Sequence, residues 1–306
     1  MRIAVIGRSE ILYEMVLFLE NKGYEISCII TSREAPEYER TARDYAILSD
    51  RLKVPFGNGS KIVEFCELIK DSKSDIAVSF NYTGIIPQDV IDMFPLGILN
   101  AHGGDLPRYR GNACQAWAIL KGEERIGLCV HKMIGGELDS GDIITRDYMR
   151  IDHSTKVTKV WEWMSLRIPL LFLEAVEKLE ADPSYILEIQ SESAEHALRC
   201  YPRKPEDGRI SWSNSAIDIL RLINASNKPY GGAFCEFEGR DMIVWDAELV
   251  LDNEIFCAVP GQITKIGEEF IEVACGNGKL RILEIEIDGL VKSPDTIIKS
   301  IRKRLS

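Results

Sequence analysis

Short apolar runs rich in β-branched residues alternate with helical patterns along the first half of the chain, and this alternation restricts the fold more than any other feature. The predicted strands are 2–7 (RIAVIG), 25–31 (EISCIIT), 75–80 (DIAVSF) and 96–102 (LGILNAH). The predicted helices are 9–22, 42–53 and 60–70. Strands separated by helices pair in parallel and take helices on both faces of the sheet. The pattern therefore predicts a doubly wound, mostly parallel α/β sheet.

The remaining sequence predicts a second, smaller domain. Residues 126–133 form a further strand, and a long helix follows at about 156–180, which Pro169 should kink or split. The proline- and charge-rich stretch YPRKPEDGR (201–209) has the composition of a linker. Short strands with turn signals follow it, and we expect a small β-barrel, OB-like, with a terminal helix reaching Arg304. The predicted domains are 1–203 and 204–306.

Composition and charge restrict the class of protein. The net charge is −11 with a pI near 5.1, which weighs against a nucleic-acid binder. No run approaches the roughly 18 apolar residues of a membrane span, and MRIAVIG is predicted as a strand rather than a signal peptide. We therefore expect a cytoplasmic location and no membrane partner. The eight cysteines form no C-x-x-C pair and the histidines number four, so we expect neither disulfides nor a metal site.

Two segments carry polar groups that can do chemistry. Asn100 and His102 end a predicted strand, and ligands of such sheets bind at the carboxyl ends of the strands. A single N-x-H is also compatible with a structural, hydrogen-bonded histidine. The segment GELDSGDIITRD (136–147) presents Asp139 and Asp142 on a glycine-bounded turn, for which a solvated turn is the alternative.

An amide, an imidazole and a carboxylate together can transfer an acyl group to an amine. A histidine can accept the proton that the attacking amine loses, and a carboxylate can orient the ring and stabilise the imidazolium. An amide N–H can donate to the oxyanion of the tetrahedral intermediate. This chemistry requires no nucleophilic serine or cysteine, and Cys114, the nearest cysteine, has no paired base.

The first strand does not end in a dinucleotide fingerprint. The turn reads G-R-S-E-I-L, with one glycine where G-x-G-x-x-G needs three, so NAD and FAD are disfavoured. A phosphate or a sugar could rest on the helix N-terminus at Arg8 and Ser9. The alternative is that Ser9 is the N-cap of the helix.

The ordered motifs N-A-H-G-G-D-L-P-R-Y-R-G (100–111), G-L-C-V-H-K-M (127–133) and L-D-S-G-D-I-I (138–144) resemble the 10-formyltetrahydrofolate-dependent formyltransferases. The resemblance implies that Asn100, His102 and Asp139 are catalytic and that 10-formyltetrahydrofolate is the formyl donor. The C-terminal part resembles the small barrel attached to methionyl-tRNA formyltransferase and to the bifunctional aminoarabinose formyltransferase.

The stretch SFNYTGIIP (79–87) is similar to the loop that grips the pterin ring in this family. The donor-binding residues that the resemblance implies are Phe80, Tyr82, Thr83, Ile85, Ile86, Pro87 and Asp142. The alternative for the end of this stretch is a strand-to-helix connection in which Pro87 starts the next helix, and both descriptions are compatible.

The family divides by its amine acceptor. The segment 31–53 balances its basic residues with acidic ones, which gives little phosphate-driven affinity for tRNA. The pattern R-G-N-A-C-Q-A-W-A-I-L (110–120) resembles enzymes that formylate amino sugars on nucleotides, as in lipopolysaccharide O-antigen biosynthesis. The candidate acceptor-binding residues are Arg8, Ser9, Arg110, Gly111 and Asn112.

The expected partner is thus a nucleoside-diphosphate amino sugar rather than a nucleic acid, with a homodimer as a further option. Arg110 could instead pair with an acid in the loop. The alternatives for the whole chain are a methionyl-tRNA formyltransferase, or a formyl-folate hydrolase or sensor that lacks an amine acceptor.

Overall fold

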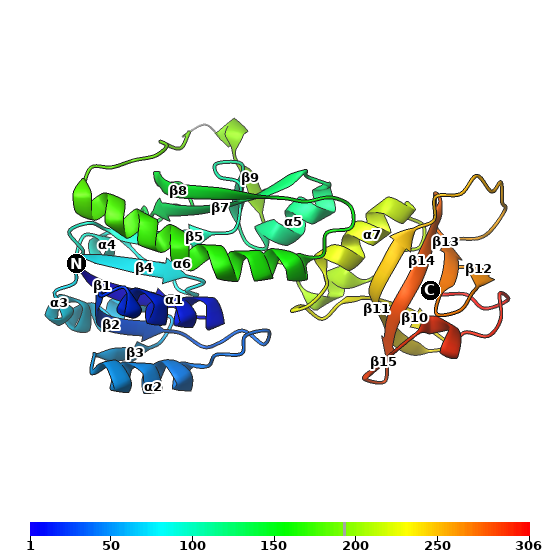
Figure 1. Ribbon diagram of the computed structural model, residues 1–306, viewed down its shortest axis with the longest axis horizontal. Coiled ribbons are helices and arrows are strands. Elements are labelled where there is room, and N and C mark those ends of the chain that lie inside the picture. Colours follow the sequence, from blue (N-terminus) through cyan, green and yellow to red (C-terminus); the bar gives the residue numbers. More distant parts are fainter. Residues whose placement is uncertain (192–193) are drawn as a thin grey trace. The chain divides into compact units, whose positions relative to one another are not determined.

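The computed structural model describes residues 1–191 and 194–306 (Figure 1). By packing, the chain divides into two compact units. The first comprises residues 1–111, 127–149 and 162–200, and the second comprises 112–126, 150–161 and 201–306. Each unit therefore draws on separate stretches of the sequence, and the domain boundary at 203/204 stays a prediction. None of the helices in the described part of the chain has the length and apolar character that a membrane crossing requires.

A seven-stranded sheet forms the centre of the first unit in the described residues. Its strands are β1 (Arg2–Gly7), β2 (Glu25–Thr31), β3 (Phe56–Asn58), β4 (Ile76–Phe80), β5 (Ile98–His102), β7 (Arg125–Lys132) and β8 (Ile143–Arg150). Their order is β3-β2-β1-β4-β5-β7-β8. The pairs from β3 to β5 are parallel, whereas β5 and β7 are antiparallel. The predicted mostly parallel sheet is confirmed, and the antiparallel pair is an addition to it.

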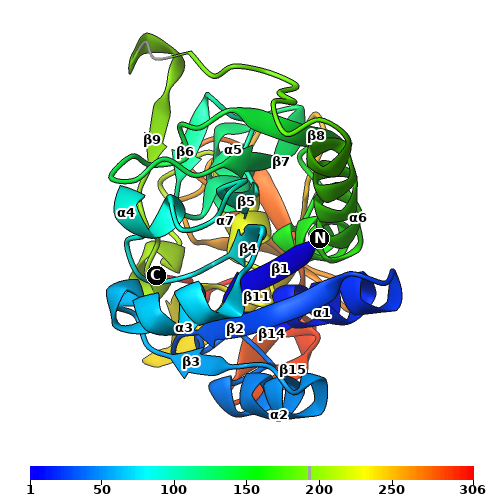
Figure 2. The same cartoon turned by 90° about the vertical axis from the view of Figure 1, so that its left-hand side faces the viewer.

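Helices cover both faces of this sheet, as Figure 2 shows. They are α1 (Glu10–Asn21), α2 (Ala42–Leu52), η1 (Ile62–Phe65), α3 (Cys66–Ser72), α4 (Gln88–Ile91) and α6 (Val157–Ala181). Alternate residues of each strand face opposite sides. Ala4 and Ile6 of β1 accordingly pack in one cluster with Ile69 of α3 and Val90 of α4. The buried strands read as continuous apolar runs because both faces are covered.

The carboxyl ends of the strands meet at one edge. The chain leaves β1 toward β2 and β3 on one side and later returns to build β4 and β5 on the other. Such a reversal of strand order leaves a crevice at the carboxyl ends, where ligands bind in open α/β sheets. A short parallel ribbon of β6 (Tyr109–Gly111) and β9 (Leu198–Cys200) follows β5, and η2 (Ala194–His196) precedes β9.

Helix α6 differs from the prediction in one respect. It extends from Val157 to Ala181 as a single helix that contains Pro169, so the proline does not split it. Ile168 and Phe172, on either side of the proline, are both buried. We attribute the continuity to this burial, which offsets the backbone hydrogen bond that a proline removes.

The second unit contains a six-stranded antiparallel sheet in the described residues. Its elements are α5 (Cys114–Lys121), η3 (Pro205–Gly208), α7 (Ala216–Ala225), β10 (Ala233–Phe237), β11 (Arg240–Leu249), β12 (Ile263–Ile266), β13 (Ile271–Ala274), β14 (Lys279–Ile287), β15 (Leu290–Lys292) and η4 (Pro294–Thr296). The strand order is β10-β11-β14-β13-β12, with β15 paired to β14. The apolar face of α7 packs on this sheet in one continuous core.

The predicted terminal helix is wrong. After η4, the tail forms a turn at Ser300–Lys303 rather than a helix, and its last residue, Ser306, exchanges two backbone hydrogen bonds with Glu236 of β10. Leu305 donates to the carbonyl of Gly261, just before β12. The tail therefore continues the hydrogen bonding of the sheet from β10 toward β12. These backbone pairings override the weak helical preference of so short a basic segment.

Candidate active site

Strand β5 delivers two polar side chains to the carboxyl edge of the sheet. Asn100 and His102 lie two residues apart and therefore point to the same side of the strand. Asn100 is half-buried and His102 is buried. In the antiparallel pairing with β7, Asn100 lies opposite His131 and His102 lies opposite Cys129. A second imidazole thus lies beside the predicted pair.

The ring of His102 is held by a backbone carbonyl. Its Nε2 lies 2.7 Å from the carbonyl oxygen of Tyr109. Because a carbonyl oxygen only accepts hydrogen bonds, Nε2 carries the proton in the neutral ring. Its Nδ1 faces Asp139, with 3.5 Å to Oδ2. Nδ1 is therefore the ring nitrogen that can take up a proton.

In the loop after β5, position 104 has room only for glycine. A Cβ atom on this residue would lie 2.5 Å from Nε2 of His102 and 2.5 Å from the carbonyl oxygen of Tyr109. Real Cβ atoms do not approach heavy atoms so closely, so any larger residue would displace the imidazole or the carbonyl. The second glycine of the G-G pair is thus required by the position of His102.

Asp139 lies on the turn between β7 and β8 and contacts three elements. Its Oδ2 accepts a hydrogen bond from the backbone N–H of Gly111 at 2.9 Å, and its Oδ1 lies 3.5 Å from Nε2 of His131. Its own backbone is left-handed, with φ +49°. The carboxylate therefore connects β5, β6 and β7 at one point.

The surroundings keep Asp139 ionised. Burial alone would raise the pKa of this carboxyl group. The charge of His102, the hydrogen bond and charge of His131 and the N–H of Gly111 outweigh burial and hold the pKa of Asp139 well below its usual range. Asp139 is therefore a carboxylate at neutral pH and can stabilise a positive charge on either imidazole.

His131 is a site residue that the sequence reasoning missed. It is only 1% exposed. Its Nδ1 lies 2.9 Å from the carbonyl oxygen of Lys132, and its Nε2 lies 3.2 Å from Nδ2 of Asn100. The available signal was an imidazole inside an otherwise apolar strand, G-L-C-V-H-K-M. Its partners follow only from the register of the β5–β7 pair.

The predicted donor-binding stretch contains both buried and exposed side chains. Phe80 and Ile86 are buried in the core, whereas Thr83 is exposed and Ile85 is 83% exposed. Pro87 occupies the N-cap position of α4, as the alternative interpretation predicted.

Tyr82 is half-buried and anchors this stretch to the neighbouring loop. Its hydroxyl donates to the carbonyl oxygen of Gly59 at 2.7 Å. Burial, with a smaller effect of Glu64, raises the pKa of Tyr82 to about 12.

The turn that carries Asp139 and Asp142 lies against the start of α4. The backbone N–H of Gly135 donates to Oε1 of Gln88 at 2.8 Å, and a Cβ on Gly135 would lie 2.3 Å from the Gln88 nitrogen. The carbonyl of Asp142 accepts from the N–H of Lys132 at 2.9 Å. The structure thus brings the 135–142 turn to Gln88, the residue that directly follows the 80–87 stretch.

The residues predicted near the end of β1 contact the protein itself. Nε of Arg8 donates to the carbonyl of Asn81 at 2.9 Å, and its Nη1 donates to the carbonyl of Arg33 at 2.7 Å. Its guanidinium also lies over the ring of Tyr38. Ser9 is fully buried and caps α1, as the alternative interpretation predicted.

Among the other predicted acceptor residues, Arg110 donates to Oε1 of Gln190 at 3.0 Å and to the carbonyl of Ser191 at 3.2 Å. These two partners are an amide and a carbonyl rather than the acid that the alternative invoked. Gly111 donates its N–H to Asp139, and Asn112 is exposed. The acceptor-binding roles of all these residues stay predictions.

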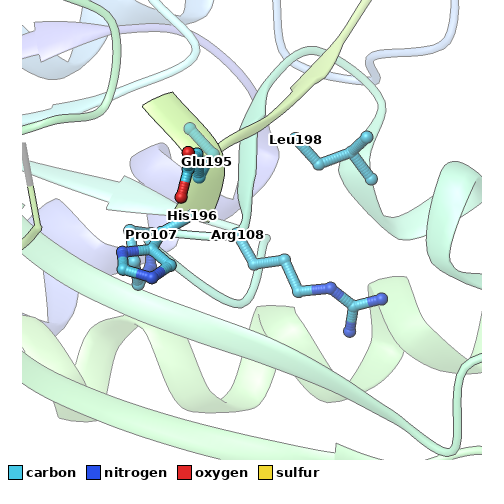
Figure 3. A pocket seen from close by; sticks show the side chains of 6 residues that line it. Pro107, Arg108, Glu195, His196 and Leu198 are labelled. Atoms are coloured by element: carbon cyan, nitrogen blue, oxygen red, sulfur yellow. The ribbon is translucent and has the colours of Figure 1, made fainter. Parts of the chain in front are cut away.

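A shallow pocket of about 530 Å³ lies beside the β6–β9 ribbon (Figure 3). Its lining residues are Pro107, Arg108, Glu195, His196, Ala197 and Leu198. Groups of both charge signs lie on its wall, and neither His102 nor Asp139 lines it. The cluster of imidazoles and carboxylate, rather than this hollow, has the chemistry of a candidate active site.

Comparisons with known proteins agree on one protein family. A family model described as formyl transferase matches residues 1–165, and a model described as formyl transferase, C-terminal domain, matches residues 203–294. A methionyl-tRNA formyltransferase of Acetivibrio thermocellus is 30% identical over 295 residues, which cover 94% of this chain and 92% of that protein.

Two solved structures share the fold. The N-formyltransferase of Helicobacter canadensis, in complex with folinic acid and dTDP-3-aminofucose, superposes with a TM-score of 0.69 at 16% identity, over 92% of this chain and 98% of that one. HypX of Aquifex aeolicus, in complex with tetrahydrofolic acid, gives a TM-score of 0.63 at 18% identity. That match covers 98% of this chain but 47% of HypX, so the chain spans about half the length of that protein.

Proposed function

The chain belongs to the formyl transferase family, and from this membership we propose that it moves the formyl group of 10-formyltetrahydrofolate to the primary amine of a nucleotide-linked amino sugar. The proposed reaction is based on one observation, which is that Asn100, His102 and Asp139 converge at the carboxyl edge of the sheet. His102 Nδ1 lies 3.5 Å from Asp139, whose pKa is held low. A base next to a permanent negative charge is suited to deprotonating an amine during attack.

Each group has one task in the proposed transfer. The acceptor nitrogen forms a bond to the formyl carbon, and the bond between that carbon and N10 of the folate breaks. Nδ1 of His102 takes the proton that the amine loses and returns it to N10, so the products are a formamide and tetrahydrofolate. Asp139 stabilises the imidazolium in between.

Asn100 stabilises the developing oxyanion in this scheme. Its Nδ2 carries two N–H groups, and one of them faces Nε2 of His131 at 3.2 Å. The second N–H remains for the formyl oxygen. A preorganised donor of this kind contributes about 3–4 kcal/mol of transition-state stabilisation.

The donor binds, in this proposal, between the 80–87 stretch and the 135–142 turn. Two observations support it. Gly135 of the turn contacts Gln88, the residue directly after the 80–87 stretch, and Ile85 presents an apolar side chain that is largely exposed. The Helicobacter canadensis and Aquifex aeolicus structures that share this fold were solved with folinic acid and tetrahydrofolic acid.

The charge of the chain supports a small acceptor over a tRNA. The net charge is −11. Within the 31–53 segment, Arg40 pairs with Glu14 at 3.4 Å and Arg51 pairs with Glu20 at 2.6 Å. Affinity for a tRNA depends on cationic side chains that displace counterions from its phosphates. The charges of Arg40 and Arg51 are partly neutralised by their acidic partners. The fold shared with the Helicobacter canadensis enzyme, which was solved with a dTDP-linked amino sugar, agrees with this choice.

Methionyl-tRNA is the second candidate acceptor. The 30% identity to the Acetivibrio thermocellus methionyl-tRNA formyltransferase over nearly the whole of both chains favours it. The two candidates share the donor and the transfer step and differ only in what presents the amine.

A competition between acceptors tests the proposal. Purified protein with 10-formyltetrahydrofolate should release tetrahydrofolate when a panel of 3- and 4-amino-deoxyhexose nucleotides is added, and mass spectrometry should detect a product heavier by one formyl group. Formylation of charged methionyl-tRNA alone would contradict the sugar acceptor. Donor breakdown without any amine would favour a hydrolase.

A further inference from the structure

Gln190 is a buried amide that contacts the candidate active site from a distant part of the sequence. The residue is 5% exposed. Its Nε2 lies 3.0 Å from the carbonyl oxygen of Asp139 and 2.6 Å from that of Gly141. Its Oε1 accepts a hydrogen bond from Arg110 at 3.0 Å. One side chain thus joins the turn that carries the carboxylate to the strand β6.

The partners fix the orientation of this amide. The two carbonyl oxygens can only accept, so the NH2 group of Gln190 must face them, and the guanidinium of Arg110 can only donate, so it must face Oε1. Three of the four hydrogen bonds that a glutamine can make are therefore satisfied in a buried place. Removing such a partner leaves buried polar groups without a hydrogen bond, which destabilises the arrangement.

The local chain direction turns Gln190 inward. The backbone around Glu188 pairs with Ile143 at the start of β8, where Ile143 donates to the Glu188 carbonyl at 2.9 Å. Successive side chains of an extended segment point to opposite sides. Ile189 accordingly is 75% exposed, whereas Gln190 is buried.

The conformation of the turn at Asp139 needs stabilising contacts from another segment of the chain. Asp139 adopts a left-handed conformation, which is unfavourable for a residue with a Cβ atom. Its carboxylate must nevertheless stay within reach of His102 Nδ1 and the Gly111 N–H. The two carbonyls that Gln190 binds flank the carboxylate-bearing turn on both sides of Ser140.

We propose that Gln190 is a positioning residue, which clamps the Asp139 turn and ties it to Arg110 so that the carboxylate faces His102. The expected loss of rate rests on the proposed function. The expected displacement of the Asp139 carboxylate does not depend on which acceptor is used. A displacement of about 1 Å in a catalytic group can cost on the order of 10²-fold in rate.

Kinetics with three variants tests the clamp. Gln190→Leu removes all three hydrogen bonds, and Gln190→Glu keeps an acceptor for Arg110 but loses the two N–H donors. We expect kcat to fall about 10- to 100-fold in both variants, with a smaller change in KM for the folate donor, because Gln190 contacts only the 135–142 side of the proposed donor site and the 80–87 stretch is untouched. Ile189→Ser, on the exposed side of the same segment, should keep the wild-type kcat. A wild-type kcat in Gln190→Glu would overturn the proposal.

A measurement that needs no turnover separates this proposal from the proposed function. Among the described residues, the charged or titratable groups that contact Asp139 directly are His102 on β5 and His131 on β7. Arg110 on β6 is connected to it through Gln190, and Glu137 and Asp142 lie on the same turn. Carboxyl ¹³C NMR should show Asp139 titrating at higher pH in Gln190→Leu than in the wild type, because the carboxylate moves away from both imidazoles. An unchanged titration in the folded variant would overturn the clamp. A wild type that transfers no formyl group would instead overturn the proposed function.

Discussion

Nδ2 of Asn100 lies 3.2 Å from Nε2 of His131, across the antiparallel pair of β5 and β7. Nδ1 of the same imidazole faces the carbonyl of Lys132 at 2.9 Å and therefore carries the proton in the neutral ring. In that neutral ring Nε2 accepts from Nδ2 of Asn100 and fixes the amide with its nitrogen inward, whereas in the protonated ring Nε2 would donate to Asp139, whose Oδ1 lies 3.5 Å away. The orientation of the proposed oxyanion donor thus depends on a histidine of another strand.

We predict that His131→Leu lowers kcat about 10- to 100-fold while the protein remains folded, because Asn100 loses the acceptor that orients it. Steady-state kinetics measures the effect. The control is His153→Leu, since His153 is exposed and lies outside this cluster. Equal rates for the two variants would show that the Asn100–His131 contact does not matter for the transfer.

Gly104→Ala should damage both rate and stability. The new Cβ would lie 2.5 Å from His102 Nε2 and from the Tyr109 carbonyl, so one of them must move. Overpacking of this kind costs about 1–3 kcal/mol, which urea denaturation can measure. Gly231→Ala, where a Cβ meets nothing within 4 Å, is the matched control. A Gly104→Ala protein with wild-type stability and rate would mean that the loop accommodates the new Cβ without a loss of folding free energy.

Asp139 should make stability depend on pH in a defined direction. Its folded-state pKa lies below its unfolded value of about 3.9, so its contribution is fully present above about pH 4 and is lost as the pH falls through the folded pKa. Asp139→Asn removes this contribution. The difference in unfolding free energy between wild type and variant should be greatest near neutral pH and should shrink in acid. A difference that stays constant from pH 7 to pH 3 would contradict the low pKa.

Ile85→Ser should affect donor binding without affecting stability. The side chain is 83% exposed, so its removal costs the folded state little, whereas the proposed pterin contact is lost. We expect KM for 10-formyltetrahydrofolate to rise about 5- to 30-fold, as for an apolar contact of about 1–2 kcal/mol. Thermal denaturation provides the control for folding. An unchanged KM would remove Ile85 from the donor site.

Some features followed from the sequence for physical reasons. The alternation of buried strands and helices requires a parallel sheet, and the topology of such a sheet brings the carboxyl ends of its strands together. Asn100 and His102 could therefore be assigned to that edge before their contacts were known. The Asp139 turn could be associated with them only by the complementary chemistry of its carboxylate and by the family resemblance, because no local pattern shows that the two segments meet.

Other features depend on contacts that no local pattern encodes. The partners of His131 follow from the register of β5 with β7, which are antiparallel in a sheet expected to be mostly parallel. Gln190 reaches Asp139 from 51 residues further along the chain. The tail pairs through Ser306 because a distant strand edge is available at Glu236, whereas its local composition favours a helix.

The most direct measurement of the central claim is a single-turnover assay of His102→Gln beside the wild type, with 10-formyltetrahydrofolate and the acceptor that the wild type uses. The glutamine fills the same space but cannot accept a proton at neutral pH. We predict a wild type that formylates its acceptor and a variant that binds folate with similar affinity but transfers the formyl group about 10²- to 10⁴-fold more slowly. A variant that transfers the formyl group at the wild-type rate would contradict the account.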